Sequence, residues 1–234
     1  MKGFFITGTD TEIGKTRISA ALTHLLASQG LRTAAIKPVA AGQELVDGRW
    51  VNDDVLALQA ASNMGLSDAE VGPFQFRTAC APHIALRLEQ RELKRAEVLA
   101  AIRSVAARAQ VSVVEGVGGF RVPLISGWDT ADLAVDLALP VVLVVGLRLG
   151  CINHALLTAE AIRARGLKLV GWVANQVDPS LPHVPDNLAA LTKGLAAVCW
   201  GHVPRLPDPT PAAVASFLNQ QLLLDTYLNQ EHSS

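Results

Sequence analysis

One short segment, GTDTEIGKT at positions 8–16, limits what this chain can fold into. It satisfies the pattern G-x-x-x-x-G-K-[ST], in which glycines let successive backbone amides converge on a phosphate. An apolar run, FFIT, precedes it, and a helical pattern, RISAALTHLLAS, follows it, so the positive end of a helix dipole adds to the site. This strand–loop–helix context predicts a phosphate-binding loop of the P-loop NTPase type.

Along the rest of the chain, short β-branched runs alternate with longer helical patterns. The runs are apolar on both faces, which is typical of parallel strands enclosed by helices. The alternation predicts an α/β fold with a doubly wound, mostly parallel sheet flanked by helices. We expect strands at 3–7, 33–37, 111–115, 141–145, 169–174 and 198–202. We expect helices at 15–29, 53–61, 82–88, 96–109, 153–165, 187–197 and from about 212, with Gly30 and Gly166 just after helix ends.

Composition narrows the class of protein further. Half of the residues are apolar and 18% are charged, which indicates a folded protein with a sizeable core. With 20 basic and 21 acidic side chains and no basic block, nucleic acid and anionic membranes are not expected as main partners. No repeat or linker divides the sequence, so we expect a single domain over residues 1–234. The segment LPHVPDN is interpreted as a loop, and a polar tail is expected from about residue 226.

The cysteines and the apolar runs indicate a compartment. The three cysteines lack C-x-x-C spacing, which fits a reducing environment better than a disulfide framework. The start of the chain lacks the features of a secretory signal, and the longest apolar run, LALPVVLVVGL, is too short to span a bilayer. We therefore expect a cytoplasmic protein.

Within the loop, two residues have clear expected roles. Lys15 would reach the β and γ phosphates, and Thr16 would ligate Mg²⁺. Partition-type ATPases carry an additional lysine directly after the first glycine of this loop. Thr9 occupies that position here, so their signature is absent.

Other polar residues fall at the ends of predicted strands, where ligands bind in such sheets. Lys37 ends the second strand. Its side chain either points into the crevice or belongs to the surface, where its stem would lie along apolar neighbours. Asp53 and Asp54 begin a helix, where one can cap it and the other can ligate a metal. Glu115 ends the third strand at the place of a second Mg²⁺ ligand, and the glycines after it allow close approach of a ligand.

The later part of the chain offers two further candidates. The helix expected near Asn153 follows a glycine-containing loop, so its free amides can hold a carboxylate, or Asn153 simply caps it. N-x-x-D at Asn175 and Asp178 is typical of purine recognition. Gln176 replaces the lysine of a guanine-reading motif, so recognition of adenine by the Asn175 amide fits better. The six histidines lack metal-ligand spacing, and His83 favours a structural role near the start of a helix.

Taken in order, the motifs resemble the dethiobiotin synthetase family. They are GTDTEIGKT, KPVAAG, NDDVLALQ, APHIA, VEGVGG, LPVVLVVGLRLGCINHALLTAEAI and GWVAN, from about residue 4 to residue 178. The resemblance implies an ATP-dependent cyclo-ligase that forms carbon–nitrogen bonds, with ATP, Mg²⁺, CO₂ and 7,8-diaminononanoate as its ligands. It also implies a carbamate, then a carbamic–phosphoric mixed anhydride, then ring closure to dethiobiotin with release of ADP and phosphate. The protein would be a homodimer with substrate bound near the interface.

The resemblance assigns roles residue by residue. The catalytic residues would be Lys37, Lys15 and Thr11, and the metal ligands would be Thr16, Asp54 and Glu115. Nucleotide would be bound by Thr9, Asp10, Glu12, Ile13, Gly14, Lys15 and Thr16, with Asn175, Pro204 and Arg205 at the base. Substrate would be bound by Thr11, Lys37, Ala41 and Gly118, and its carboxylate by Gly150, Cys151, Ile152 and Asn153 across the dimer.

One position departs from the family pattern. The family commonly has a serine after KPVA, and Ala41 stands there in this sequence. Loss of one hydrogen bond of about 1 kcal/mol would weaken substrate binding without abolishing chemistry. Three other interpretations stay open: an ATP-dependent amidoligase domain, a non-catalytic nucleotide switch, and a P-loop protein that has kept only its structure.

Overall fold

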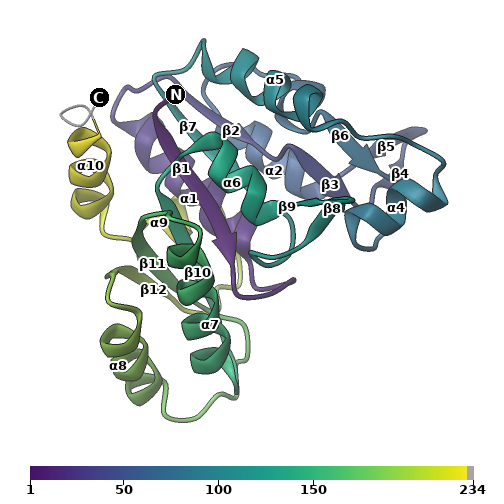
Figure 1. Cartoon of the computed structure of the whole chain (residues 1–234). Helices are drawn as coiled ribbons and strands as arrows, with labels where there is room; N and C mark the ends of the chain where they lie inside the picture. Colours follow the sequence, from purple (N-terminus) through teal and green to yellow (C-terminus); the bar gives the residue numbers. More distant parts are fainter. Residues whose placement is uncertain (231–234) are drawn as a thin grey trace.

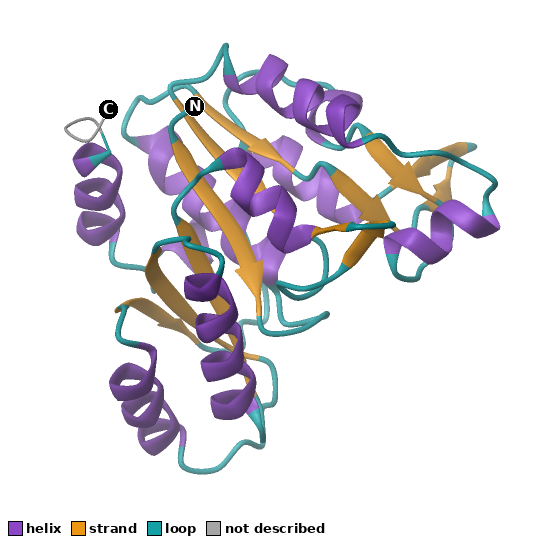
Figure 2. Cartoon of the chain, in the orientation of Figure 1, coloured by secondary structure: helices purple, strands orange, loops and turns teal. Residues whose placement is uncertain are grey.

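A six-stranded parallel sheet forms the centre of the molecule in the computed structural model, which describes residues 1–230 (Figures 1 and 2). Its strand order is β12-β11-β10-β1-β7-β2, and every neighbouring pair is parallel. The strands are β1 (Gly3–Gly8), β2 (Thr33–Ile36), β7 (Val111–Glu115), β10 (Val141–Leu147), β11 (Leu169–Gln176) and β12 (Val198–Val203).

Helices connect these strands and cover the sheet. They are α1 (Lys15–Ser28), α2 (Asp53–Ala61), α3 (Asp68–Val71), α4 (Pro82–Leu88), α5 (Arg95–Ala106), α6 (Thr130–Leu137), α7 (Cys151–Ala164), α8 (Val184–Leu195), α9 (Pro211–Ala215) and α10 (Gln220–Asn229). In the described part of the chain, three two-stranded pairs lie outside the central sheet: β3 (Val39–Ala41) with β6 (Phe74–Phe76), β4 (Glu44–Val46) with β5 (Arg49–Val51), and β8 (Pro123–Ile125) with β9 (Trp128–Asp129).

Each face of the sheet packs against its own set of helices. Alternate residues along a strand point to opposite faces, so Phe5 joins the cluster that contains α6 and α7, while Phe4 and Ile6 join the cluster that contains α1, α9 and α10. Figure 1 shows α6 and α7 in front of the sheet and α1 behind it. Burial on both sides explains why the strands read as continuous apolar runs.

The order of the strands determines where a ligand can bind. Strand β1 lies between β7 and β10, so the chain continues to one side of β1 for β2 and β7 and to the other side for β10, β11 and β12. In open parallel sheets the crevice for a ligand lies at such a switch point, outside the carboxyl ends of the strands. The loop at positions 8–16 leaves β1 at this point.

The six strands expected from sequence are confirmed, with ends within about two residues of those observed. Gly30 and Gly166 follow α1 and α7 with positive φ of 78° and 72°, which confirms their placement after helix ends. The helix expected from about residue 212 is two helices, α9 and α10. Tyr227 is buried in α10, so the segment expected to form a polar tail from about 226 is helical as far as Asn229. Residues 231–234 of that expected tail lie outside the described part.

Other expectations were wrong in specific places. Helix α6 was not expected at all, although Asp129 and Asp132 form a capping box at its start. The segment interpreted as the loop LPHVPDN contributes the first turn of α8, where Pro185 is tolerated because a helix start needs no amide donor. The side chain that caps α2 belongs to Asn52, which accepts from the Val55 amide, and not to either aspartate that follows.

Candidate active site

A cavity of about 790 Å³ opens at the carboxyl edge of the sheet, beside the loop that follows β1. Its walls come from the loop itself, the start of α1, the ends of β2 and β7, the start of α2, and the segment before α4. Ten of the residues expected from sequence line it: Thr11, Glu12, Gly14, Lys15, Thr16, Lys37, Ala41, Asp54, Glu115 and Gly118. The cavity therefore brings together side chains that lie about a hundred residues apart in the chain, such as Thr16 and Glu115.

The loop is shaped by one glycine and one amide side chain. Gly14 precedes α1 with φ of 77°, a left-handed conformation that favours glycine. Asn175, at the end of β11, donates from Nδ2 to the Ile13 carbonyl at 2.8 Å. A Cβ atom at Gly14 would lie 2.3 Å from that Nδ2, so the contact also requires glycine for space.

Strand β10 and its following loop hold the other half of the phosphate loop. The Thr9 amide donates to the Val144 carbonyl at 3.0 Å, and Arg148 forms an ion pair with Asp10. The other carboxylate oxygen of Asp10 accepts from the Thr11 amide at 2.8 Å. Gly146 leaves room for Ile13, because a Cβ atom there would lie 2.4 Å from Cγ2 of Ile13.

Four side chains from different elements meet at the floor of the cavity. The Lys37 ammonium donates to Asp54 Oδ2 at 2.5 Å and to Glu115 Oε1 at 2.7 Å. The Thr16 hydroxyl donates to the same Glu115 oxygen at 2.7 Å. The end of β2, the end of β7 and the first turns of α1 and α2 supply these groups, so the parallel topology itself creates the cluster.

Electrostatics keep this cluster charged. Burial alone would lower the pKa of Lys37, but the carboxylates of Glu115 and Asp54 outweigh it and hold that pKa above its ordinary value. Burial would raise the pKa of Asp54, but the Lys37 ammonium and hydrogen bonds from Lys37 and Thr16 hold it below its usual range. Both partners of the pair are therefore ionised at neutral pH.

Lys15 has a different environment. Burial lowers its pKa, and the Lys37 ammonium acts in the same direction. The carboxylates of Glu115, Asp54 and Asp10 only partly oppose this shift. Among residues 1–230 its ammonium has no hydrogen bond or ion pair. A buried ammonium without a direct hydrogen bond or ion pair among the described residues favours an anionic ligand such as a phosphate.

The donor set fits Mg²⁺. Oε2 of Glu115 is buried and has no hydrogen-bond partner within the described residues, so it is available to a cation. Asp54, Glu115 and the Thr16 hydroxyl offer hard oxygen ligands, and Mg²⁺ is commonly held by one or two carboxylates together with phosphates and water. Within residues 1–230, no group of three or more His, Cys, Asp or Glu side chains is placed to hold a metal ion.

The remaining residues expected from sequence lie outside the lining of this cavity. Ile13, in the loop, is buried. Asn175 is buried as well, and its Oδ1 has no hydrogen-bond partner among residues 1–230. Asn153 is the third residue of α7, and Gly150 precedes that helix with φ of 90°, so the capping role considered for Asn153 is wrong. The residues outside the lining are Thr9, Asp10, Ile13, Asn175, Pro204, Arg205, Gly150, Cys151, Ile152 and Asn153.

Several lining residues were missed by sequence reasoning. Arg17 lines the cavity, and its place directly after Lys15 and Thr16 was the available signal. The others lie in the irregular segment after β7, in the segment before α4, and at the first residue of α4. They are Val117, Val122, Ala79, Cys80, Ala81 and Pro82. The ring of His83 does not line the cavity, and its Nδ1 lies 3.3 Å from the Pro123 carbonyl oxygen.

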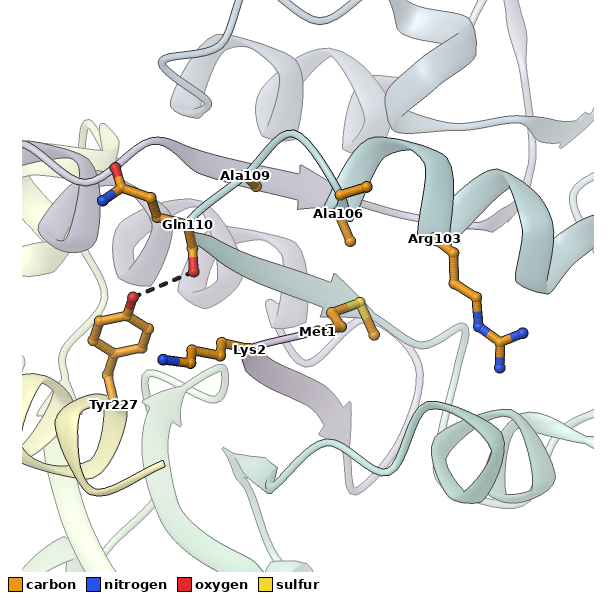
Figure 3. A pocket seen from close by; sticks show the side chains of 8 residues that line it. Met1, Lys2, Arg103, Ala106, Ala109, Gln110 and Tyr227 are labelled. Carbon is orange, nitrogen blue, oxygen red and sulfur yellow. Dashed lines mark hydrogen bonds between the residues drawn. The ribbon is translucent and has the colours of Figure 1, made fainter. Parts of the chain in front are cut away.

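A second cavity, of about 520 Å³, lies at the opposite edge of the sheet (Figure 3). Met1 and Lys2, just before β1, line it together with Arg103 and Gln110, and the Tyr227 hydroxyl donates to the Gln110 carbonyl at 3.2 Å. None of the site residues expected from sequence contributes to it, so the chemistry is assigned to the cavity at the carboxyl edge.

No helix within residues 1–230 has both the length and the apolar character needed to cross a bilayer.

Comparison with known proteins bears on this arrangement at two levels. Two solved structures share the fold. The MinC:MinD cell division protein complex of Aquifex aeolicus has a TM-score of 0.55 and 16% identity, and the match covers 100% of this chain and 97% of that chain. A ParA family ATPase of Chlorobium tepidum has a TM-score of 0.54 and 12% identity, and the match covers 97% of this chain and 99% of that chain. A family model described as an AAA domain matches residues 2–213. The fold and the site define a P-loop NTPase.

The sequence relatives identify the family more specifically than the shared fold does. An ATP-dependent dethiobiotin synthetase BioD of Janthinobacterium sp. is 54% identical over 92% of this chain and 93% of its own length. Proteins with the same name from Pseudomonas aeruginosa and Aromatoleum aromaticum are 54% and 49% identical over 94% and 93% of this chain, and 96% of their own lengths. The chain belongs to the dethiobiotin synthetase family, a family of ATP-dependent carbon–nitrogen ligases.

Proposed function

We propose that this protein carboxylates 7,8-diaminononanoate with CO₂ and closes the ureido ring of dethiobiotin at the expense of ATP. The observation that supports it most is the meeting of Lys37, Thr16, Asp54 and Glu115 beside the phosphate loop, because that cluster suits a reaction between several anions. Residues 1–234 would form one ligase domain, and its three free thiols suit a reducing cytosol.

In this proposal the nucleotide occupies the loop that begins α1. Backbone amides around Gly14 and the ammonium of Lys15 hold the β and γ phosphates. Thr16, Asp54 and Glu115 hold Mg²⁺, which neutralises negative charge on those phosphates when it is bound. The adenine lies beyond Asn175, whose unpaired Oδ1 supports a contact with the base, and Pro204 and Arg205 line the base pocket.

The chemistry proceeds in three steps. One amine of the substrate adds to CO₂ and loses a proton, which gives a carbamate. A carbamate oxygen attacks the γ-phosphorus, ADP leaves, and a carbamic–phosphoric mixed anhydride forms. The second amine then attacks the carbonyl carbon and gives up a proton to the phosphoryl oxygens, phosphate leaves, and the ring closes. Lys37 and Lys15 stabilise the anionic groups throughout, and Thr11 holds the diamine or its carbamate by a hydrogen bond.

The substrate carboxylate requires a second subunit in this proposal. Gly150, Cys151, Ile152 and Asn153 do not line the cavity of their own chain, so a partner subunit must bring them to it. Leu149 is 92% exposed directly before that helix, as expected for a residue covered by a partner. Leu149→Asp is therefore expected to lower the molar mass by sedimentation and to raise the KM for the diamine. Leu45→Asp, at a leucine that is 59% exposed on β4, is the matched control and should change neither.

The deciding experiment measures phosphate release from Mg-ATP with and without 7,8-diaminononanoate plus bicarbonate, and dethiobiotin by mass spectrometry in the same samples. Release that requires both additions and matches product one to one is the expected result. Phosphate release that does not depend on the diamine would reject the proposed synthetase activity. In that case, stimulation by a carboxylate with an ammonia source would indicate an amidoligase, and stimulation by a protein partner would indicate a nucleotide switch.

A further inference from the structure

The segment between β7 and β8 forms a wall of the cavity beside Thr11 of the phosphate loop. Val117, Gly118 and Val122 line the cavity from this segment. Gly118 has φ of 60°, and a Cβ atom there would lie 3.0 Å from Cγ2 of Val122 and 3.5 Å from the Thr11 hydroxyl oxygen. The wall therefore stands close to Thr11, and a small shift of Val122 would change the width of the cavity at that point.

This wall has no regular secondary structure, and one residue outside the cavity holds it. The Thr130 hydroxyl donates to the Phe120 carbonyl at 2.6 Å and accepts from the Val122 amide at 3.0 Å. The Thr130 amide donates to the Val122 carbonyl at 3.0 Å. Both backbone groups of Val122 are thus fixed by Thr130, whose side chain is 1% exposed.

Thr130 is itself firmly placed, because it is the first residue of α6. Asp129 caps that helix, and Asp129 and Asp132 exchange hydrogen bonds between side chain and backbone at 2.9 Å. Arg121 donates to Asp129 at 2.5 Å, and Arg165, just after α7, donates to Asp132 at 2.5 Å. The start of α6, which lies over the sheet in Figure 1, is a rigid anchor for the wall.

We propose that Thr130 is a positioning residue for the diamine: through Val122 and Gly118 it sets the width of the cavity beside Thr11, without taking part in nucleotide binding. The inference rests on the proposed function, because it names the side of the site that the diamine occupies. Thr130 touches neither the phosphate loop nor the metal-binding cluster through any of its hydrogen bonds.

The test compares Thr130→Val, which keeps the shape and removes the hydroxyl, with Thr130→Ser, which keeps the hydroxyl. Thr23→Val is the matched control, since the Thr23 hydroxyl is equally buried and donates to the Ser19 carbonyl at 2.7 Å on the far face of the sheet. Each variant is assayed, at a temperature where it is folded, for the KM of the diamine, for kcat, and for the dissociation constant of a fluorescent ADP.

For Thr130→Val we expect the KM of the diamine to rise about tenfold, with ADP affinity unchanged within about twofold. Thr130→Ser should restore the KM to within about threefold of wild type, and Thr23→Val should leave it unchanged even if it lowers stability. An unchanged KM in Thr130→Val, an equal loss of ADP affinity, or a Ser variant as impaired as the Val variant would overturn the inference. A wild-type protein without diamine-dependent turnover would instead overturn the proposed function, and this inference with it.

Discussion

Lys37 and Glu115 form a buried ion pair, with the ammonium 2.7 Å from Oε1 of a carboxylate whose side chain is fully enclosed. The same ammonium lies 2.5 Å from Asp54. The two carboxylates that suit a divalent cation therefore share one lysine ammonium in the protein alone, which offsets one of their two negative charges. Binding of a metal and binding of this ammonium therefore compete for the same two carboxylates, although Oε2 of Glu115 has no hydrogen-bond partner among the described residues.

This competition predicts that Lys37→Met binds Mn²⁺ more tightly than wild type when no nucleotide is present, by about tenfold, because a positive charge leaves the immediate surroundings of the ligands. Electron paramagnetic resonance titration of free Mn²⁺ measures it. Arg17→Met removes another cation from the cavity lining and is the matched control, with a change of less than about twofold expected. Weaker Mn²⁺ binding in Lys37→Met would show that the ammonium supports the metal site instead of competing with it.

Gly14→Ala should weaken nucleotide binding by roughly tenfold to a hundredfold. The new Cβ would lie 2.3 Å from Nδ2 of Asn175, and the alanine would have to adopt φ of 77°. The phosphate loop must therefore move. Isothermal titration with ADP measures the loss. Gly30→Ala has nearly the same φ, 78°, with no atom within 4 Å of the new Cβ, and so separates backbone strain from the clash. Equal affinities in the Gly14 variant and wild type would count against the role of the loop.

Ala41→Ser should lower the KM of the diamine about fivefold, since a hydroxyl at this cavity-lining position adds a hydrogen bond of about 1 kcal/mol. The KM of ATP, measured in the same phosphate-release assay, should not change. A serine variant with an unaltered or higher KM of the diamine would place the substrate away from residue 41.

The pair of Lys37 and Asp54 also predicts how stability depends on pH. The pKa of Asp54 is lowered in the folded protein, so its contribution is complete above the unfolded pKa of about 3.8 and is lost as the pH falls through the lower folded value. The raised pKa of Lys37 places its loss above about 10.5. The difference in unfolding free energy between wild type and Asp54→Asn should thus be flat from about pH 5 to 9 and shrink below about pH 4.

Because 45% of the Asp54 side chain is exposed, the plateau should be no more than about 1 kcal/mol. Denaturant unfolding at each pH gives the free energies. Asp53→Asn, at the neighbouring aspartate, should show no such plateau. A difference that grows toward acid pH would contradict the direction of the Asp54 shift.

Sequence reasoning worked where chemistry and local geometry coincide in one short segment. Strand ends carry the polar residues of a parallel sheet, so the residue pattern alone was enough to assign Lys37 and Glu115 to one edge. The direct bond between them could not be assigned in this way, because it depends on which strands are neighbours: β7 lies beside both β1 and β2, an order that no local pattern encodes.

The helix starts that sequence reasoning missed have physical causes as well. The start of α6 is determined by the exchange of hydrogen bonds between Asp129 and Asp132, and Asp132 stands where the usual sequence signature of a capping box has Glu or Gln. The start of α8 includes a proline that is often interpreted as a loop signal. Whether Asn175, Pro204 and Arg205 contact a base, and whether Gly150 and the residues after it serve a partner subunit, stay predictions.

Gly146 has a wider consequence. A Cβ atom there would lie 2.4 Å from Ile13, and Ile13 is held in place through the Asn175 contact to its carbonyl. A library randomised at position 146 should therefore return almost only glycine, although this residue does not line the active-site cavity. Intolerance to substitution at such a position reflects how the phosphate loop packs against the sheet. A mutational scan of this protein that equated intolerance with catalysis would therefore assign too many residues to the active site.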